Sequence, residues 1–137
     1  MHRSAIAIGG ALGAIARYGV GVVAVAGAGT AFPWGTLAVN IAGAWVLGLL
    51  MCVLPRSTVR PSVRAGLTIG FCGGFTTFSA FAHETVVLSR EGSQSLAMTY
   101  VVASVALGVM AISAGMAVGA LLVGRGREGP EARAGRP

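Results

Sequence analysis

The sequence predicts an all-α membrane protein with four transmembrane helices, the third of which is broken near the middle of the membrane. Of the 137 residues, 55% are hydrophobic and only 10% are charged, whereas soluble domains carry roughly 25% charged residues. Mean hydropathy is +0.80. Four apolar segments each exceed the roughly 20 residues that a helix needs to cross a bilayer. A Gly-Gly and Thr-Thr interruption inside the third segment predicts the break.

The first two segments cover residues 4–26 and 33–54, and each holds one polar side chain of interest. Arg17 interrupts the first segment and shares a helix face with Gly9 and Gly13. It either extends to the far interface or acts as a buried cation that lends positive potential to an anion vestibule. Asn40 lies in the second segment, where its amide either bonds a neighbouring helix or faces a polar pathway as a donor.

The third segment, residues 62–88, holds the most informative stretch, GFCGGFTTFSAFAHE at residues 70–84. The glycine pair, Gly73 and Gly74, weakens a helix, and Thr76 and Thr77 can redirect backbone hydrogen bonds. A break frees carbonyls that suit a cation and N–H groups that suit an anion. Beyond it, the spacing of three places the following side chains on one face: Phe78, Phe81 and Glu84.

The fourth segment covers residues 95–123 and is uncharged. Tyr100 and Ser104 lie four apart, followed on the same face by Gly108. Their hydroxyl groups form a polar track, or Ser104 bonds its own helix backbone. We expect residues 1–124 to form one transmembrane unit, and the Arg-, Gly- and Pro-rich residues 125–137 to form a disordered cytoplasmic tail.

Glycine is abundant, at 22 residues. Membrane helices use small residues for close backbone approach, so the GxxxG pairs predict a tight bundle and an oligomer. These pairs are Gly9 and Gly13, Gly66 and Gly70, and Gly115 and Gly119.

Composition also excludes several functions. The chain has no Lys and no Asp, which removes a Walker-type phosphate loop and a paired-aspartate active site. Cys52 and Cys72 lack metal or redox spacing. We find no nucleophile–base pair, so the sequence does not predict an enzyme.

Three motifs in order resemble the small fluoride channels of the CrcB or Fluc family. They are GGALGAIARY at residues 9–18, GTLAVNIAG at residues 35–43, and the stretch at residues 70–84. The resemblance covers the chain up to about Val123. It implies passive export of fluoride across the cell membrane, which relieves fluoride toxicity.

The resemblance also implies an antiparallel, dual-topology dimer of four-helix subunits with two fluoride pores. A structural sodium ion would lie at the dimer centre on the backbone carbonyls of Gly73 and Thr76. The residues implied to line the pore are Asn40, Phe78, Phe81, Ser79, Tyr100 and Ser104. Arg17, Glu84 and Thr77 would line the vestibule or support the pore.

The chain departs from the family pattern at two positions. Ala80 stands where threonine is common, and Gly108 stands where another hydroxyl is frequent. Both departures reduce the polar track and leave open whether both pores conduct.

Two alternatives stay open from the residues alone. The first is a small multidrug-type proton-coupled transporter, which needs a membrane-embedded carboxylate that the first two segments lack. The second is a non-transporting membrane assembly subunit, which explains the glycine packing but not the stretch at residues 70–84.

The distribution of arginine predicts how the chain inserts. The N-terminus, the loop at residues 55–61, the adjoining flank of the third segment and the tail share one side of the membrane. That side holds most arginines: Arg3, Arg56, Arg60, Arg64, Arg125, Arg127, Arg133 and Arg136. The other side receives Arg90, with Arg17 if it extends there. The positive-inside rule places both termini in the cytoplasm. A chain with this bias inserts one way, which favours a heterodimer with an oppositely oriented paralogous subunit.

Overall fold

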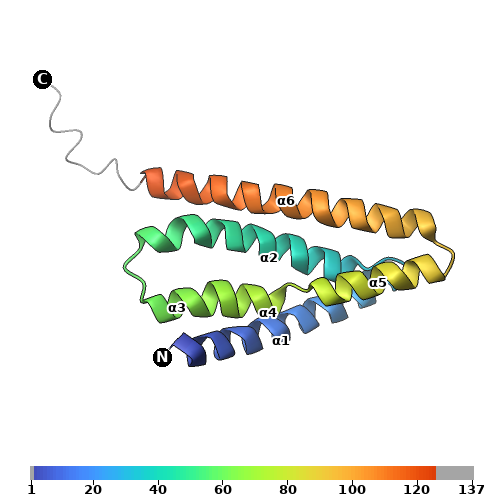
Figure 1. The fold of residues 1–137 in the computed structure, drawn as a ribbon, viewed down its shortest axis with the longest axis horizontal. Helices are drawn as coiled ribbons and strands as arrows, with labels where there is room; N and C mark the ends of the chain where they lie inside the picture. Colours follow the sequence, from blue (N-terminus) through green and yellow to red (C-terminus); the bar gives the residue numbers. More distant parts are fainter. Residues whose placement is uncertain (1, 126–137) are drawn as a thin grey trace, which may run out of the picture.

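The computed structural model describes residues 2–125, which form a bundle of long helices running up and down (Figure 1). The first two are α1 (His2–Ala28) and α2 (Trp34–Val53), which ends in the 3-10 turn η1 (Leu54–Arg56). The third is built from α3 (Pro61–Ala65), the π-helical η2 (Gly66–Cys72), α4 (Gly73–Phe75) and α5 (Phe78–Arg90). The fourth is α6 (Gln94–Arg125).

Within the described residues, four helical stretches are long and apolar enough to cross a membrane: His2–Ala28, Trp34–Val53, Pro61–Arg90 and Gln94–Gly124. This confirms the prediction of four long apolar helices with an interrupted third. The start of α1, the α2–α3 connection and the end of α6 lie at one end of the bundle (Figure 1). Residues 126–137, which hold most of the predicted tail, lie outside the described residues, and Arg125 is the last residue of α6.

The turn between α5 and α6 ends one helix and starts the next in very few residues. Gly92 has a φ of 78°, which a residue without a Cβ adopts at little cost. The Ser93 N–H donates to the Leu88 carbonyl at 3.0 Å, and the Gly92 N–H donates to the Ser89 carbonyl at 3.3 Å. This is the Schellman pattern of helix termination, and it folds α6 back along α5.

The bundle exposes large apolar side chains over most of its length, including Val23 at 72% and Leu121 at 65%. Its buried hydrophobic cluster is small and lies where α2, α5 and α6 meet: Leu37, Leu88, Ala97 and Tyr100. Contiguous apolar surface of this extent indicates contact with lipid or with another membrane chain.

Glycine lets α1 lie directly against the third helix. A methyl group on Gly9 would overlap the carbonyl oxygen of Gly66, and one on Gly13 would overlap that of Phe71. Methyl groups on Gly70 and Gly74 would likewise collide with the backbone of α1. The packing interpretation of these glycines is therefore confirmed.

Glycine also permits close packing between α2 and α6. A methyl group on Gly115 would overlap the Trp45 carbonyl, and one on Gly119 would lie 2.7 Å from the Cβ of Cys52. From the opposite helix, Gly48 approaches the carbonyl of Ile112. These contacts fix the position of α6, and with it the two side chains, Tyr100 and Ser104, that the sequence singles out.

Candidate functional site

The third helix is interrupted at Thr76 and Thr77. Their backbones are extended, with φ and ψ of −83° and 158° for Thr76 and −150° and 118° for Thr77. The preceding glycine pair stays helical, with φ and ψ of −66° and −35° at Gly73. Of the two residue pairs that predicted a break, the extended backbone therefore lies at the threonine pair. Gly74 instead permits contact with the carbonyl of Gly10 in α1.

Side chains take over the backbone hydrogen bonds at this break. The Thr76 hydroxyl donates to the Cys72 carbonyl at 2.9 Å. The Thr77 N–H donates to Asn40 Oδ1 at 2.8 Å, and the Ala80 N–H donates to Thr77 Oγ1 at 3.2 Å. Thr77 is thus the N-cap of α5.

Carbonyls just before the break lose their helical partners as a result, among them those of Gly73 and Thr76. In a continuous helix the Gly73 carbonyl would accept from the N–H of residue 77, and the Thr76 carbonyl from the N–H of residue 80. Both N–H groups instead donate to side-chain oxygens. Within residues 2–125, no hydrogen bond from beyond α4 reaches either carbonyl. Freed carbonyl oxygens thus occur at the two positions that the resemblance assigns to a sodium site.

Asn40 holds the break from α2. Its Nδ2 donates to the Thr77 carbonyl at 3.1 Å, while its Oδ1 accepts the Thr77 N–H. Of the two interpretations of Asn40, the bond between neighbouring helices is therefore present. The amide nitrogen carries a second hydrogen, and Asn40 also lines a groove. A role as a donor in that groove is compatible with the bonds to Thr77.

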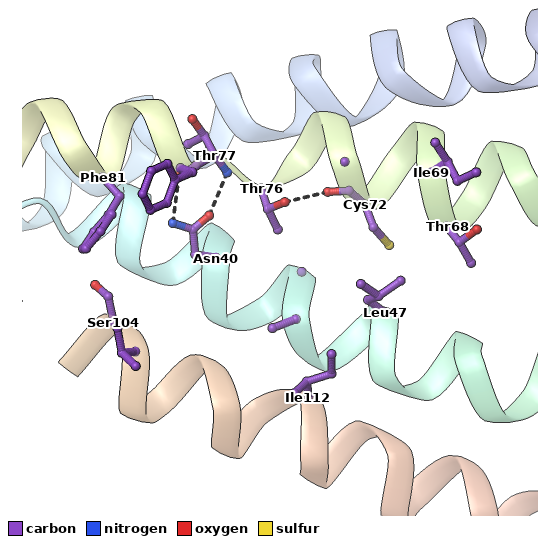
Figure 2. A pocket seen from close by; sticks show the side chains of 15 residues that line it. Asn40, Leu47, Thr68, Ile69, Cys72, Thr76, Thr77, Phe81, Ser104 and Ile112 are labelled. Carbon is purple, nitrogen blue, oxygen red and sulfur yellow. Dashed lines mark hydrogen bonds between the residues drawn. The ribbon is translucent and has the colours of Figure 1, made fainter. Parts of the chain in front are cut away.

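This groove, with a volume of about 510 Å³, runs past the break between α2, the third helix and α6 (Figure 2). Its lining includes four of the six residues expected in the pore, Asn40, Phe78, Phe81 and Ser104, but not Ser79 or Tyr100. Gly73, Thr76 and Thr77, which were expected at the sodium site or as support, also line it. Figure 2 shows Phe81 and Ser104 facing the same space from α5 and α6. The remaining walls are mainly apolar, so the groove offers few polar partners to an ion.

The two phenylalanines of the groove differ in exposure. Their ring centroids lie 5.6 Å apart with planes at 46°. Phe81 is half-buried and its ring lies 5.3 Å from that of Tyr100, which fixes its orientation. Phe78 exposes 79% of its surface. Like the other exposed apolar side chains of the bundle, Phe78 is placed to contact lipid or another membrane chain.

Ser104 carries a buried hydroxyl oxygen with no hydrogen-bond partner among the described residues. The bond from Ser104 to its own helix backbone, which was one of the two interpretations of this residue, is therefore absent. A buried hydroxyl without a partner costs about 1–3 kcal/mol. Because Ser104 lines the groove, its O–H is a free donor there.

Tyr100 and Glu84 form a separate polar cluster, and Thr36 joins it. The fully buried Tyr100 donates its hydroxyl to Glu84 Oε2 at 2.7 Å. Thr36 donates to Glu84 Oε1 at 2.7 Å from the start of α2. Glu84 and Thr36 also line a second groove of about 500 Å³. Sequence reasoning missed Thr36, although it lies one helical turn before Asn40 on the same face.

The remaining predicted residues lie at the edges of these features. Ser79 is exposed, and its hydroxyl lies 3.1 Å from that of Thr77. Arg17 is half-buried and lines neither groove. Within residues 2–125 it forms no ion pair or hydrogen bond, so the structure leaves both interpretations of Arg17 open.

Comparison with known proteins decides the family. The protein-family model described as "CrcB-like protein, Camphor Resistance (CrcB)" matches residues 4–116 of this sequence. The chain belongs to the CrcB family. The match extends from α1 into α6 and includes the lining residues of both grooves. Family membership and the four candidate spans together place this chain in a membrane.

Several curated relatives align over nearly their whole length, and each is named fluoride-specific ion channel FluC. The chain is 50% identical to that of Geobacter sulfurreducens over 113 residues, which is 82% of this chain and 91% of the relative. It is 43% identical to that of Acidobacterium capsulatum over 119 residues, 86% of this chain and 95% of the relative. It is 47% identical to that of Chelativorans sp. over 116 residues, which is 84% of this chain and 93% of the relative.

Proposed function

We propose that this chain is a subunit of a fluoride-specific ion channel that lets fluoride leave the cell passively. The observation that carries the proposal is the identity of 43–50% to relatives named as such channels, over more than 80% of the chain. Membership of the CrcB family favours this function over a proton-coupled transporter and over an assembly subunit.

The groove past the break has the chemistry that a fluoride path requires. Aromatic rings are electropositive at their edges. Phe78 and Phe81 can therefore face an anion without binding it as tightly as a positively charged side chain would. The second N–H of Asn40 and the free hydroxyl of Ser104 can replace part of the lost hydration. Conduction needs binding that is favourable yet weak enough for release. The absence of a charged residue from the groove lining supports this balance.

The freed carbonyls of Gly73 and Thr76 support a structural sodium site. Carbonyl oxygens are hard ligands that suit hard cations, and no carboxylate is needed. The Gly73 and Thr76 carbonyls of one chain are too few to surround a cation by themselves. A second subunit would supply the others, and the bound ion would hold the two breaks together.

An antiparallel dimer accounts for the exposed surface around the break. Phe78, at 79% exposure, and the exposed Gly73 lie together beside the groove. A partner that packs there would cover Phe78 and close the groove into a pore. The arginine bias further favours a heterodimer in which this subunit has both termini in the cytoplasm. Reporters fused to each terminus test this: a single orientation supports the heterodimer, and equal populations of both orientations favour a homodimer.

Fluoride efflux from liposomes tests the function. The protein, with its partner if one is needed, is reconstituted in sodium buffer, and efflux is recorded with a fluoride electrode. We expect efflux well above empty liposomes and a strong reduction in Phe81→Ile. Phe71→Ile is the matched control, because Phe71 stacks on Phe75 outside the groove. Equal efflux from both variants would remove Phe81 from the path, and proton-coupled cation efflux would favour the transporter.

A further inference from the structure

One turn of α2 contacts both residues of the break. Asn40 bonds the backbone of Thr77, and Gly43, three residues later, contacts Thr76. We call Asn40 and Gly43 the α2 notch. No other helix among the described residues donates a side-chain hydrogen bond to the extended backbone of Thr76 and Thr77.

The amide of Asn40 acts as a substitute for a backbone partner. It donates to the Thr77 carbonyl and accepts the Thr77 N–H, at 3.1 and 2.8 Å. Thr77 is only 8% exposed, so water does not readily reach these groups. An unpaired backbone group buried at membrane depth costs several kcal/mol. Without Asn40, the N–H of Thr77 would regain the Gly73 carbonyl by closing the helix.

Gly43 supplies the space for the break. A methyl group on Gly43 would overlap Cγ2 of Thr76 and would lie 3.2 Å from Cδ1 of Phe75. The Thr76 side chain cannot turn away freely, because its hydroxyl donates to the Cys72 carbonyl. A Cβ at position 43 would therefore push the break away from α2 and weaken both bonds of Asn40.

We propose that the α2 notch is the element that holds the third helix open and keeps the Gly73 carbonyl free for the cation. Asn40 is in this respect a positioning residue: it takes the N–H that would otherwise occupy that carbonyl. This inference rests on the proposed sodium site, but the conformation of the break can be measured without sodium.

The first test removes the amide. Asn40→Leu keeps a similar volume and loses both hydrogen bonds. We measure the sodium concentration at the midpoint of thermal stabilisation, and the hydrogen exchange of the Thr77 amide. We expect the midpoint to rise at least tenfold and the protection of Thr77 to change. Ser113→Ala is the control, because Ser113 bonds only the Val109 carbonyl of its own helix.

The second test changes the steric fit of the notch and leaves the Asn40 amide in place. Gly43→Ala should raise the sodium midpoint, and adding Thr76→Ser should restore it. Serine removes the Cγ2 methyl group that collides with the new Cβ, and keeps the hydroxyl and the carbonyl. Gly19→Ala serves as the control, because a methyl group there meets nothing within 4 Å. Rescue by Thr76→Ser is specific to this contact, since a general loss of folding would not be reversed.

The outcomes distinguish a failure of the α2 notch proposal from a failure of the sodium proposal. If sodium does not stabilise the wild-type protein, the sodium proposal fails, and the exchange of Thr77 alone decides the notch. Protection that is lost or altered in Asn40→Leu but kept in Ser113→Ala supports the notch. An unchanged sodium midpoint and unchanged Thr77 protection in Asn40→Leu, or no rescue of Gly43→Ala by Thr76→Ser, overturns it.

Discussion

Removing the hydroxyl of Tyr100 should destabilise the protein through Glu84. Tyr100 is 0% exposed and its hydroxyl lies 2.7 Å from Glu84 Oε2. Tyr100→Phe keeps the ring and its packing on Phe81, so the loss is confined to one hydrogen bond. Hydrogen bonds to charged groups contribute about 1.5–3 kcal/mol in soluble proteins. Bonds between membrane helices average about 0.6 kcal/mol and reach about 1.7. We therefore expect a loss of about 1–2 kcal/mol.

The chain provides its own control for this substitution. Tyr18 is 75% exposed and has no hydrogen bond within residues 2–125, so Tyr18→Phe should change stability by less than about 0.5 kcal/mol. Equilibrium unfolding in mixed micelles measures both variants. A double-mutant cycle with Glu84→Gln should give a coupling of about 1 kcal/mol. Equal effects of Tyr100→Phe and Tyr18→Phe, or a coupling near zero, would refute the assignment of this bond.

Three further outcomes follow from the packing and the groove. In α1, Gly13→Ala should lower the unfolding free energy by about 1–3 kcal/mol relative to Gly19→Ala, because only the first methyl group meets backbone atoms; equal stabilities would contradict the packing. Ser104→Ala should reduce fluoride efflux and leave stability unchanged or raised by about 1 kcal/mol, since its hydroxyl has no partner; unchanged efflux would remove it from the path. Replacing sodium by a large organic cation should lower the dimer fraction on size-exclusion chromatography, and an unchanged fraction would count against the sodium site.

The long helices could be predicted from the sequence because hydropathy and length constrain a membrane helix strongly. Segments expected at residues 4–26 and 33–54 correspond to His2–Ala28 and Trp34–Val53 in the structure. The packing of Gly9 and Gly13 was also predictable, since few residues permit such close backbone approach. Family membership, expected from three motifs, is confirmed by the match over residues 4–116.

The details of the site could not be predicted from residue patterns. Gly73 and Gly74 resembled helix breakers, but glycine also permits close packing, and the choice depends on what lies opposite. The partner of Gly74 is the backbone of α1, which no local pattern reveals. The link between Thr36 and Glu84 spans 48 positions in the chain, so only the fold brings them together. For Asn40, sequence alone left two interpretations, and the bonds to Thr77 establish one of them.

Fluoride efflux from liposomes that contain the protein and any required partner tests the central claim most directly. In sodium buffer, the proposed function predicts rapid efflux of fluoride, little efflux of chloride under the same gradient, and a strong reduction in Phe81→Ile but not in Phe71→Ile. Fluoride efflux no faster than from empty liposomes would contradict it, provided that the protein is folded and any oppositely oriented partner subunit is present.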